Sequence, residues 1–147
     1  YLSYKKKSFK HRNLILKLVK SHGKWSGMNP FVNEKKKDYL NKSLDQKIVV
    51  ITRATLKWNK LFSFWMAVPF ASRAINKAKG VLFYKGIGEW PFIQQATISI
   101  WDNFEAVNMF AYKNFQHAKI VKKTRQNKWY KEDLFSRFYL ISDKTKN

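Results

Sequence analysis

The order in which strand-like and helix-like patterns alternate from Lys47 onward is the feature that most limits the possible fold. A short β-branched run covers Lys47–Leu56, and apolar residues at helical spacing follow it over Leu61–Ile75. Two further strand-like segments come next, Gly80–Gly88 and Gln94–Trp101, and a second helix and a closing strand complete the series. The order β-α-β-β-α-β predicts an α+β fold built on a ferredoxin-like unit.

Proline and capping residues indicate where the predicted helices begin and where they break. Pro69 is expected to kink or split the first helix. Asp102 is expected to begin the second helix, because Glu105 follows it three residues later in a capping-box arrangement. This helix is expected to continue to about Arg125, and Asp133–Ile141 reads as the closing strand.

The first part of the chain does not resemble a complete domain. Leu14–Val19 is a plausible strand, Ser21–Phe31 reads as a loop rich in Gly, Ser, Asn and Pro, and Glu34–Asp45 reads as a polar linker. Because the chain opens on Tyr1 rather than Met, we expect residues to be missing upstream. The predicted organisation is the end of a truncated preceding ferredoxin-like unit plus a linker (residues 1–46), a C-terminal ferredoxin-like unit (47–142) and a polar tail (143–147).

Composition narrows the possible partners. Hydrophobic residues make up 45% of the chain and aromatic residues 17%, which excludes a disordered basic tail. The net charge of +21 points to nucleic acid, an anionic membrane surface or an acidic protein, or else to an ordinary Lys-rich surface. Without cysteine, the chain has no disulfide, zinc-thiolate, iron–sulfur or cysteine-nucleophile chemistry, which fits a reducing cytoplasm. No apolar run reaches the roughly 18–20 residues that span a bilayer.

The segment KGIGEWPF (Lys85–Phe92) looks like an RNA-binding signature, in which aromatic side chains stack on bases. Here Ile87 and Glu89 occupy the stacking positions, and an acidic side chain repels phosphate. We therefore predict no nucleic-acid partner. We interpret Gly86 and Gly88 as part of a turn between strands, in which glycine is free to adopt a positive φ.

Strand alternation separates two sets of side chains in the predicted sheet. One set is apolar (Ala96, Ile98 and Ile100) and is expected to pack beneath the helices. The other set is polar and aromatic and is expected to line the opposite face: Thr97, Ser99 and Trp101, with Arg53 and Thr55 of the first strand. This mixture suits a ligand cavity and equally an ordinary half-exposed sheet face, and the pattern leaves both open.

His117 is the most informative ionisable residue. Ile120, Val121 and Thr124 follow it at helical spacing, so we expect His117 to face inward from its helix. A histidine in that position can ligate a metal or transfer a proton, but more often it makes a buried hydrogen bond. Because the chain has no HxH or HExxH motif, carboxylate cluster or Ser-His-Asp set, any chemistry is expected to be carried by a cofactor, and no catalytic residue is assigned.

Several separated motifs, taken together, resemble the spheroidene monooxygenase family of carotenoid-modifying oxygenases. The match extends in order and in spacing over about Lys47–Leu140, and GKWSGMNPF (Gly23–Phe31) resembles the link between the two halves of that family. The matching motifs are TRAT (Thr52–Thr55), LFSFWMAVPFASRAI (Leu61–Ile75), GVLFYKGIGEWP (Gly80–Pro91), QATISIW (Gln95–Trp101), FAY (Phe110–Tyr112) and WYKEDLFSRF (Trp129–Phe138).

The resemblance implies a fold of the dimeric α/β-barrel type, with two ferredoxin-like units paired within one chain or in a homo-oligomer. It also implies a haem cofactor and its iron, O₂ as co-substrate, a ferredoxin-type electron donor, and a carotenoid substrate that gains hydroxyl or keto oxygen. His117 stands where the family has a histidine in its second helix and is the expected iron ligand. Arg53 and Arg125 are expected to pair with haem propionates. Three aromatic residues are expected to wall the haem or the polyene: Trp101, Trp129 and Tyr130.

The basic charge then has a specific interpretation. A carotenoid resides in the bilayer, so a cytoplasmic enzyme that acts on it is expected to dock peripherally on anionic headgroups, and the same charge suits an acidic ferredoxin. Two alternatives remain, a non-catalytic α/β-barrel protein that binds a small molecule and, less favoured, a basic RNA-binding domain.

Overall fold

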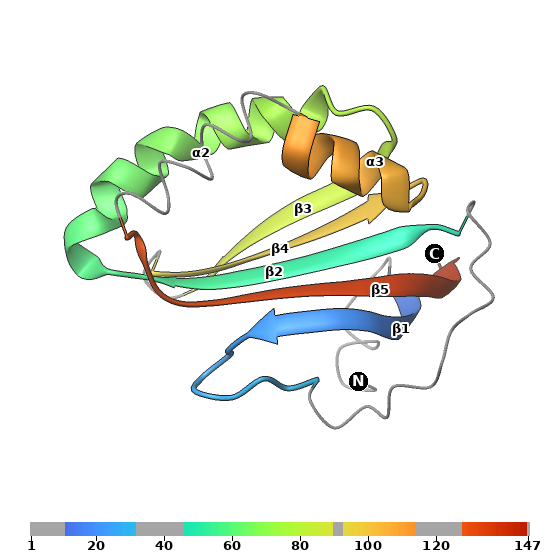
Figure 1. Cartoon of the computed structure of the whole chain (residues 1–147), viewed down its shortest axis with the longest axis horizontal. Coiled ribbons are helices and arrows are strands. Elements are labelled where there is room, and N and C mark those ends of the chain that lie inside the picture. The colour runs from blue at the N-terminus through green and yellow to red at the C-terminus, as the bar shows by residue number, and fades with distance from the viewer. Residues whose placement is uncertain (1–10, 32–45, 90–92, 114–127, 147) are drawn as a thin grey trace.

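The computed structural model of the chain describes residues 11–31, 46–89, 93–113 and 128–146. Figure 1 shows one layer of strands with α2 and α3 on the same side of it. The elements in chain order are β1 (His11–Gly23), β2 (Ile48–Leu56), the 3-10 turn η1 (Trp58–Lys60), α2 (Leu61–Asn76), β3 (Val81–Glu89), β4 (Gln94–Trp101), α3 (Phe104–Asn108), the π-helical turn η3 (Met109–Lys113) and β5 (Tyr130–Lys146).

The sheet has five strands in the order β1-β5-β2-β4-β3, and each neighbouring pair is antiparallel. Without β1, the order of the remaining strands is fourth, first, third, second, with one helix after the first strand and another after the third. This arrangement confirms the predicted ferredoxin-like unit. β1 adds a fifth strand at the edge beside β5.

The helices follow their local sequence, with two corrections. α2 is one helix of 16 residues that continues through Pro69, so the expected split does not occur. Pro69 lies on the exposed side of α2, where water can replace the hydrogen bond that its missing N–H removes. α3 is capped by Asn103, whose side chain accepts a hydrogen bond from the Ala106 N–H, and not by Asp102 as expected. Among the described helices, none is long and apolar enough to cross a membrane.

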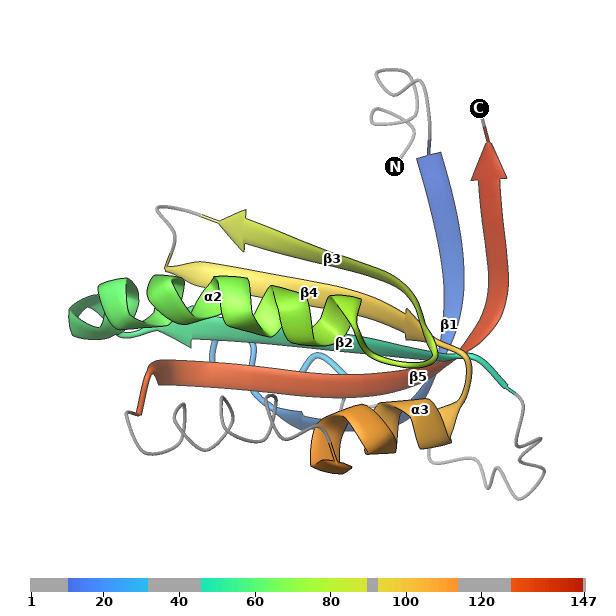
Figure 2. The same cartoon turned by 90° about the horizontal axis from the view of Figure 1, so that it is seen from above.

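β5 is longer than the sequence predicts. It ends at Lys146, well beyond the expected end at Ile141, and β1 likewise extends from His11 to Gly23. The two strands lengthen each other by pairing: His11 lies opposite Lys146, and Gly23 lies opposite Leu134. Residues expected to form a polar tail are therefore paired in a strand. Figure 2 shows the distal parts of β1 and β5 leaving the plane of the other strands together.

The register of the sheet reverses the faces expected for the two sets of β4 side chains, whereas Arg53 of β2 lies on the expected face, away from the helices. Ile48 lies opposite Trp101 and Val50 opposite Ser99, and Ile48, Val50 and Trp101 form a core cluster with Val107 of α3. Hence Thr97, Ser99 and Trp101 face the helices, where we had expected the Ile98 and Ile100 set. Two core clusters lie on this helix-covered face: Ile48, Val50, Trp101 and Val107, and Leu56, Phe64, Ile93 and Trp129.

The face away from the helices, here called the open face, carries the third core cluster. Val49, Ile100 and Phe138 are its buried members. Leucines of β1 and an aromatic residue that follows β1 pack against them, so the N-terminal strand supplies part of this core: Leu14, Leu16, Leu18 and Phe31. The isoleucines of β4, Ile98 and Ile100, pack on the open face because the leucines of β1 cover them there.

Gly86 and Gly88 are strand residues and do not form a turn. They pair with Thr97 and Gln95 within β3 and β4, and neither has a positive φ. The expected turn was placed too early because the β3 pairing continues to Glu89. The residues that follow, 90–92, lie outside the described part of the chain.

Gly23 joins β1 to the hairpin that follows it, and its backbone requires glycine. Its φ is +90°, and a Cβ atom built there would lie 2.1 Å from the carbonyl oxygen of Asp133. Gly27 has a similar φ of +86°, but a Cβ atom there would have no neighbour within 4 Å.

We expect Gly23→Ala to lower the free energy of unfolding by about 3 kcal/mol or more, because backbone strain and a backbone clash add together. Gly27→Ala is the matched control, and it should lower the same free energy by about 1–2 kcal/mol from the strain alone. Urea unfolding of the two variants measures both values. Equal losses would show that the close approach of Gly23 to β5 is absent in solution.

Candidate functional site

The strongest candidate site is an aromatic cluster under the N-terminal half of α2. Trp129 has 1% of its surface exposed, and its ring meets Phe64 of α2 edge-on, with ring centres 5.7 Å apart. Phe64 also makes edge contacts with Trp65 at 5.4 Å and with Tyr130 at 6.3 Å. The two residues expected to wall a cofactor or polyene, Trp129 and Tyr130, therefore lie together between sheet and helix. Edge-to-face rings of this kind pack tightly, so these side chains form a rigid part of the core between the sheet and α2.

Trp129 carries an unused hydrogen-bond donor within this cluster. Its Nε1 atom is buried and has no hydrogen-bond partner among the described residues. A buried indole N–H usually finds an acceptor, and leaving one unpaired costs about 1–3 kcal/mol. By contrast, the Trp129 carbonyl oxygen is used, because it accepts a hydrogen bond from the Lys57 N–H over 2.9 Å.

Trp101 lies on the same helix-covered face but in the other core cluster of that face. Its ring packs on Phe110 of η3, with centres 5.1 Å apart. Its Nε1 atom donates to the hydroxyl of Ser99 over 2.9 Å, so this indole N–H is satisfied within the protein. Trp101 therefore serves the core between β4 and α3, and it does not join the cluster around Trp129.

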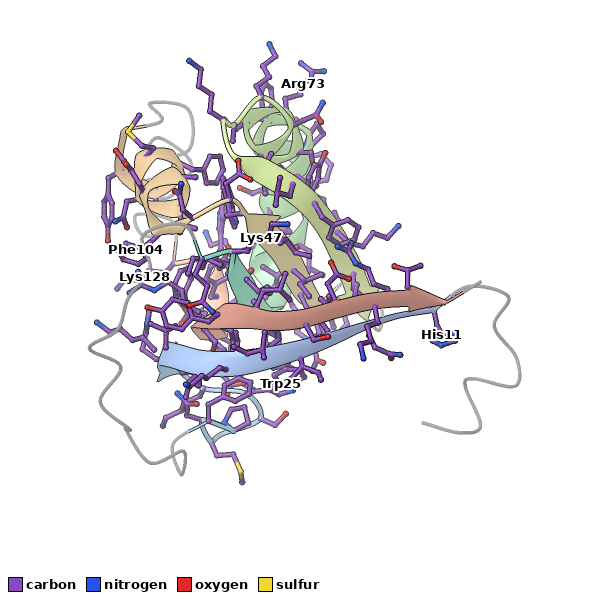
Figure 3. The ribbon with its side chains drawn as sticks, turned by 90° about the vertical axis from the view of Figure 1, so that its right-hand side faces the viewer. His11, Trp25, Lys47, Arg73, Phe104 and Lys128 are labelled. Atoms are coloured by element: carbon purple, nitrogen blue, oxygen red, sulfur yellow. The ribbon has the colours of Figure 1, made fainter. Side chains whose placement is uncertain are left out.

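Arg53 lies on the open face, opposite to the face that carries the three predicted aromatic residues. Its guanidinium donates from Nη2 to Oε1 of Gln94 over 2.8 Å and from Nη1 to Oε1 of Glu132 over 3.4 Å. Its Cζ atom also lies 4.8 Å from the centre of the Trp25 ring, in a cation–π contact. Figure 3 shows Trp25 on the side of the β1–β5 ribbon away from α2. A haem propionate would have to displace these partners, so Arg53 is better explained as a structural residue.

Glu132 fastens the hairpin that follows β1 onto β5. Its two carboxylate oxygens accept hydrogen bonds from the N–H groups of Ser26 and Gly27, each over 2.7 Å. These bonds, first that of Gly27, together with the positive charges of Arg53 and Lys24, hold the pKa of Glu132 below its ordinary value. The carboxylate thus links the hairpin and Arg53 in one network, which we call the Glu132 clasp.

The predicted site residues are only partly brought together. Trp129 and Tyr130 share one cluster, Trp101 belongs to another cluster on the same face, and Arg53 is on the opposite face. His117 and Arg125 lie outside the described residues. Sequence reasoning missed Glu132, Gln94 and Trp25 as partners of Arg53, because a buried arginine in a strand indicates that acceptors are needed without indicating which ones.

The described histidines do not approach the aromatic cluster. His22 lies on β1, and its ring stacks on Phe135 with centres 5.2 Å apart. His11 is the first residue of β1 and pairs with Lys146 at the far end of the ribbon. No group of three or more His, Cys, Asp or Glu side chains within the described ranges is placed to hold a metal ion.

We expect the Glu132 clasp to depend on pH. Because the folded state lowers the pKa of Glu132, the clasp stabilises the fold fully above the ordinary carboxyl pKa and loses its effect as the pH falls through the lowered value. Glu132→Gln should therefore be less stable than the parent chain at neutral pH, and this difference should shrink on acidification.

Hydrogen exchange at the Ser26 and Gly27 amides locates the effect. Both should exchange faster in Glu132→Gln at neutral pH and remain slow in Glu105→Gln, a matched control that removes the same charge from α3. If both variants left these amides protected, the carboxylate would not be what holds the hairpin.

Comparison with known proteins extends these observations. No protein-family model matches the chain. Over 128 residues it is 35% identical to a spheroidene monooxygenase of Rhodobacter capsulatus. This alignment covers 87% of this chain and 52% of that protein. Over 142 residues it is 33% identical to a spheroidene monooxygenase of Cereibacter sphaeroides. This second alignment covers 96% of this chain and 42% of that protein. The chain thus spans about half the length of the curated relatives it matches.

Solved structures share the fold at much lower identity. A candidate monooxygenase of Fusobacterium nucleatum superposes with a TM-score of 0.62 over 91% of this chain and 53% of its own, at 8% identity. A candidate monooxygenase of Lactobacillus acidophilus superposes with a TM-score of 0.58 over 71% of this chain and 49% of its own, at 14% identity. These structures support the predicted α+β fold class of the dimeric α/β-barrel type. The sequence matches to the two curated proteins confirm the resemblance to the spheroidene monooxygenase family along most of this chain.

Proposed function

We propose that this chain forms part of a haem-dependent monooxygenase that acts on a carotenoid. The observation that carries the proposal is the 35% identity to a spheroidene monooxygenase over 87% of the chain. Since about half of that relative is matched, the activity, substrate and electron donor of the whole relative are transferred here as proposals. The fold of the described residues is compatible with them.

The aromatic cluster around Trp129 supports the haem part of the proposal. A porphyrin is flat and apolar with a polar edge, and it needs a wall of aromatic or aliphatic side chains and a few polar anchors. Phe64, Trp129 and Tyr130 supply the first requirement, and the unpaired Nε1 of Trp129 supplies a donor for a propionate oxygen or a substrate oxygen. We therefore propose the helix-covered face for the group, because the guanidinium of Arg53 on the open face is already engaged by Gln94 and Glu132.

The proposed ligand of the iron is His117, with Arg125 as partner of a propionate. A neutral imidazole is a common axial ligand of haem iron, and without any cysteine in the chain a thiolate ligand cannot come from these residues. Both Arg53 and Arg125 were expected to pair with propionates, and we propose Arg125 alone because the guanidinium of Arg53 is engaged. The assignments of His117 and Arg125 concern residues outside the described part of the chain and rest on the family resemblance.

The proposed cofactor and the side chains of this protein have separate roles in the reaction. A bound haem would supply the activation of O₂, with two electrons from a ferredoxin-type donor and two protons from water, so that one oxygen atom would enter the carotenoid and the other would leave as water. The chain's own contribution is to bind the polyene along aromatic and aliphatic side chains, to orient its end, and to exclude water from the helix-covered face. Trp129 and Tyr130 are proposed for binding and orientation.

Hemin titration of the purified chain tests the cofactor directly. We expect a Soret band that saturates at one haem per chain. His117→Ala should weaken hemin binding by at least about tenfold and shift the band, because one coordination bond is lost. His22→Ala is the matched control, since His22 stacks on Phe135 of β5 and is not a proposed ligand, and it should keep the parent spectrum.

Two results would oppose the proposal. Equal spectra for all three proteins would place the iron ligand elsewhere, and no saturable Soret band would leave a non-catalytic α/β-barrel protein as the better description.

A second experiment tests the substrate. The protein is expressed in a spheroidene-producing host, and the pigments of that host are then identified. We expect a hydroxylated or keto carotenoid that the host alone does not make.

A further inference from the structure

The outward side of α2 carries a row of large apolar side chains that the protein core does not use. Phe62, Met66 and Phe70 are 80%, 61% and 62% exposed. They recur every four residues, so they lie along one side of the helix over about 12 Å. Trp58 of η1, 66% exposed, precedes them in the chain. We call these four residues the α2 ridge.

The α2 ridge is separate from the face that holds the helix on the sheet. Phe64, two residues after Phe62, is 5% exposed and packs against Trp129. A surface helix ordinarily presents charged or polar residues to water on the side that does not pack. Several neighbouring aromatic residues exposed on one helix instead mark a surface that meets another apolar phase.

The charged residues of η1, α2 and the segments that adjoin them in the chain are all positive. No Asp or Glu occurs in the sequence between Asp45 and Glu89. Arg73 lies over the Phe70 ring, 5.9 Å from its centre, and Figure 3 shows it at the outer edge of α2, away from the sheet. The basic residues that flank the ridge along η1, α2 and the segment after it are Lys57, Lys60, Arg73, Lys77 and Lys79.

We propose that the α2 ridge is a membrane-docking surface that lies in the interface of an anionic lipid bilayer. Apolar side chains on one side of a helix with cations along its flanks are the features of a helix that lies in the plane of the interface. Trp58, Phe62 and Phe70 enter the boundary between headgroups and acyl chains, and the flanking cations meet lipid phosphates. An acidic partner protein would pair with the cations, but its acidic groups would not bury the exposed aromatic side chains of the ridge.

The proposal explains why Phe62 and Phe64 serve different ends on one helix. Phe64 fixes α2 to the sheet, and Phe62 holds the whole unit at the lipid surface. Because α2 also covers the aromatic cluster around Trp129, a docked α2 would place that cluster next to the lipid phase. Lipid alone is the ligand here, so the inference stands whether or not haem or a carotenoid binds.

Flotation with large unilamellar vesicles tests the proposal without any pigment. We expect the chain to bind vesicles of 70% phosphatidylcholine and 30% phosphatidylglycerol, to bind pure phosphatidylcholine at least about tenfold more weakly, and to be released as salt rises. The double variant Phe62→Ser/Phe70→Ser should bind the anionic vesicles at least about tenfold more weakly than the parent chain, while its circular dichroism spectrum is unchanged.

A matched control removes apolar surface elsewhere. Ile15→Ser/Met28→Ser replaces two residues that are 59% and 69% exposed, on β1 and on the hairpin after it, and should bind anionic vesicles as the parent does. Equal losses in both double variants would overturn the assignment to α2. So would absence of vesicle binding, or self-association without lipid that only the Phe62→Ser/Phe70→Ser variant abolishes, which would make the ridge an interface between copies.

A single fluorescent label reports the position of the ridge directly. Because the chain has no cysteine, Met66→Cys and Met28→Cys each create one labelling site. An environment-sensitive fluorophore at position 66 should shift to the blue on addition of anionic vesicles, and the same fluorophore at position 28 should not. The opposite pattern, or equal shifts, would contradict the proposal.

Discussion

The antiparallel register that holds β2 between β4 and β5 determines which side of the sheet every functional side chain faces. Val50 lies opposite both Ser99 and Arg137, and Arg53 lies opposite both Ala96 and Leu134. A shift of one residue would exchange the two faces completely. The burial of Ile48 and Val50 against α3 on one side, and of Val49 on the other, resists such a shift.

This register gives the two faces of the sheet different properties. The helix-covered face is aromatic, and the buried indole N–H of Trp129 has no partner among the described residues. The open face combines an apolar core, to which β1 contributes, with the charged network of Arg53 and Glu132. The open face thus fastens the N-terminal hairpin to the sheet, and the helix-covered face is the one proposed for the cofactor. On the outer side of α2, the ridge adds a surface suited to lipid.

The order of elements was predictable because strand and helix periods are local properties of the sequence. The assignment of faces was not, because each alternating set of β4 contains residues that become buried, Ile100 in one and Ser99 and Trp101 in the other, and the partner that decides between them is β1. Likewise, Arg53 and Glu132 lie 79 residues apart, so their contact follows from the register of β2 with β5 and from no local motif. Trp129 and Tyr130 were singled out as wall residues from the family motif, but their packing against Phe64 of α2 was not predicted.

The central claim is that haem binds on the helix-covered face of the sheet. Methyl NMR spectra of the chain recorded with and without ferric hemin test it most directly, because the paramagnetic iron broadens resonances near it. The account predicts broadening of the methyl signals of Leu56 and Val68, which pack in the cluster around Trp129, and unchanged signals from Ile51 and Ile98 on the open face. Broadening of Ile51 and Ile98 with sharp signals from Leu56 and Val68 would contradict it.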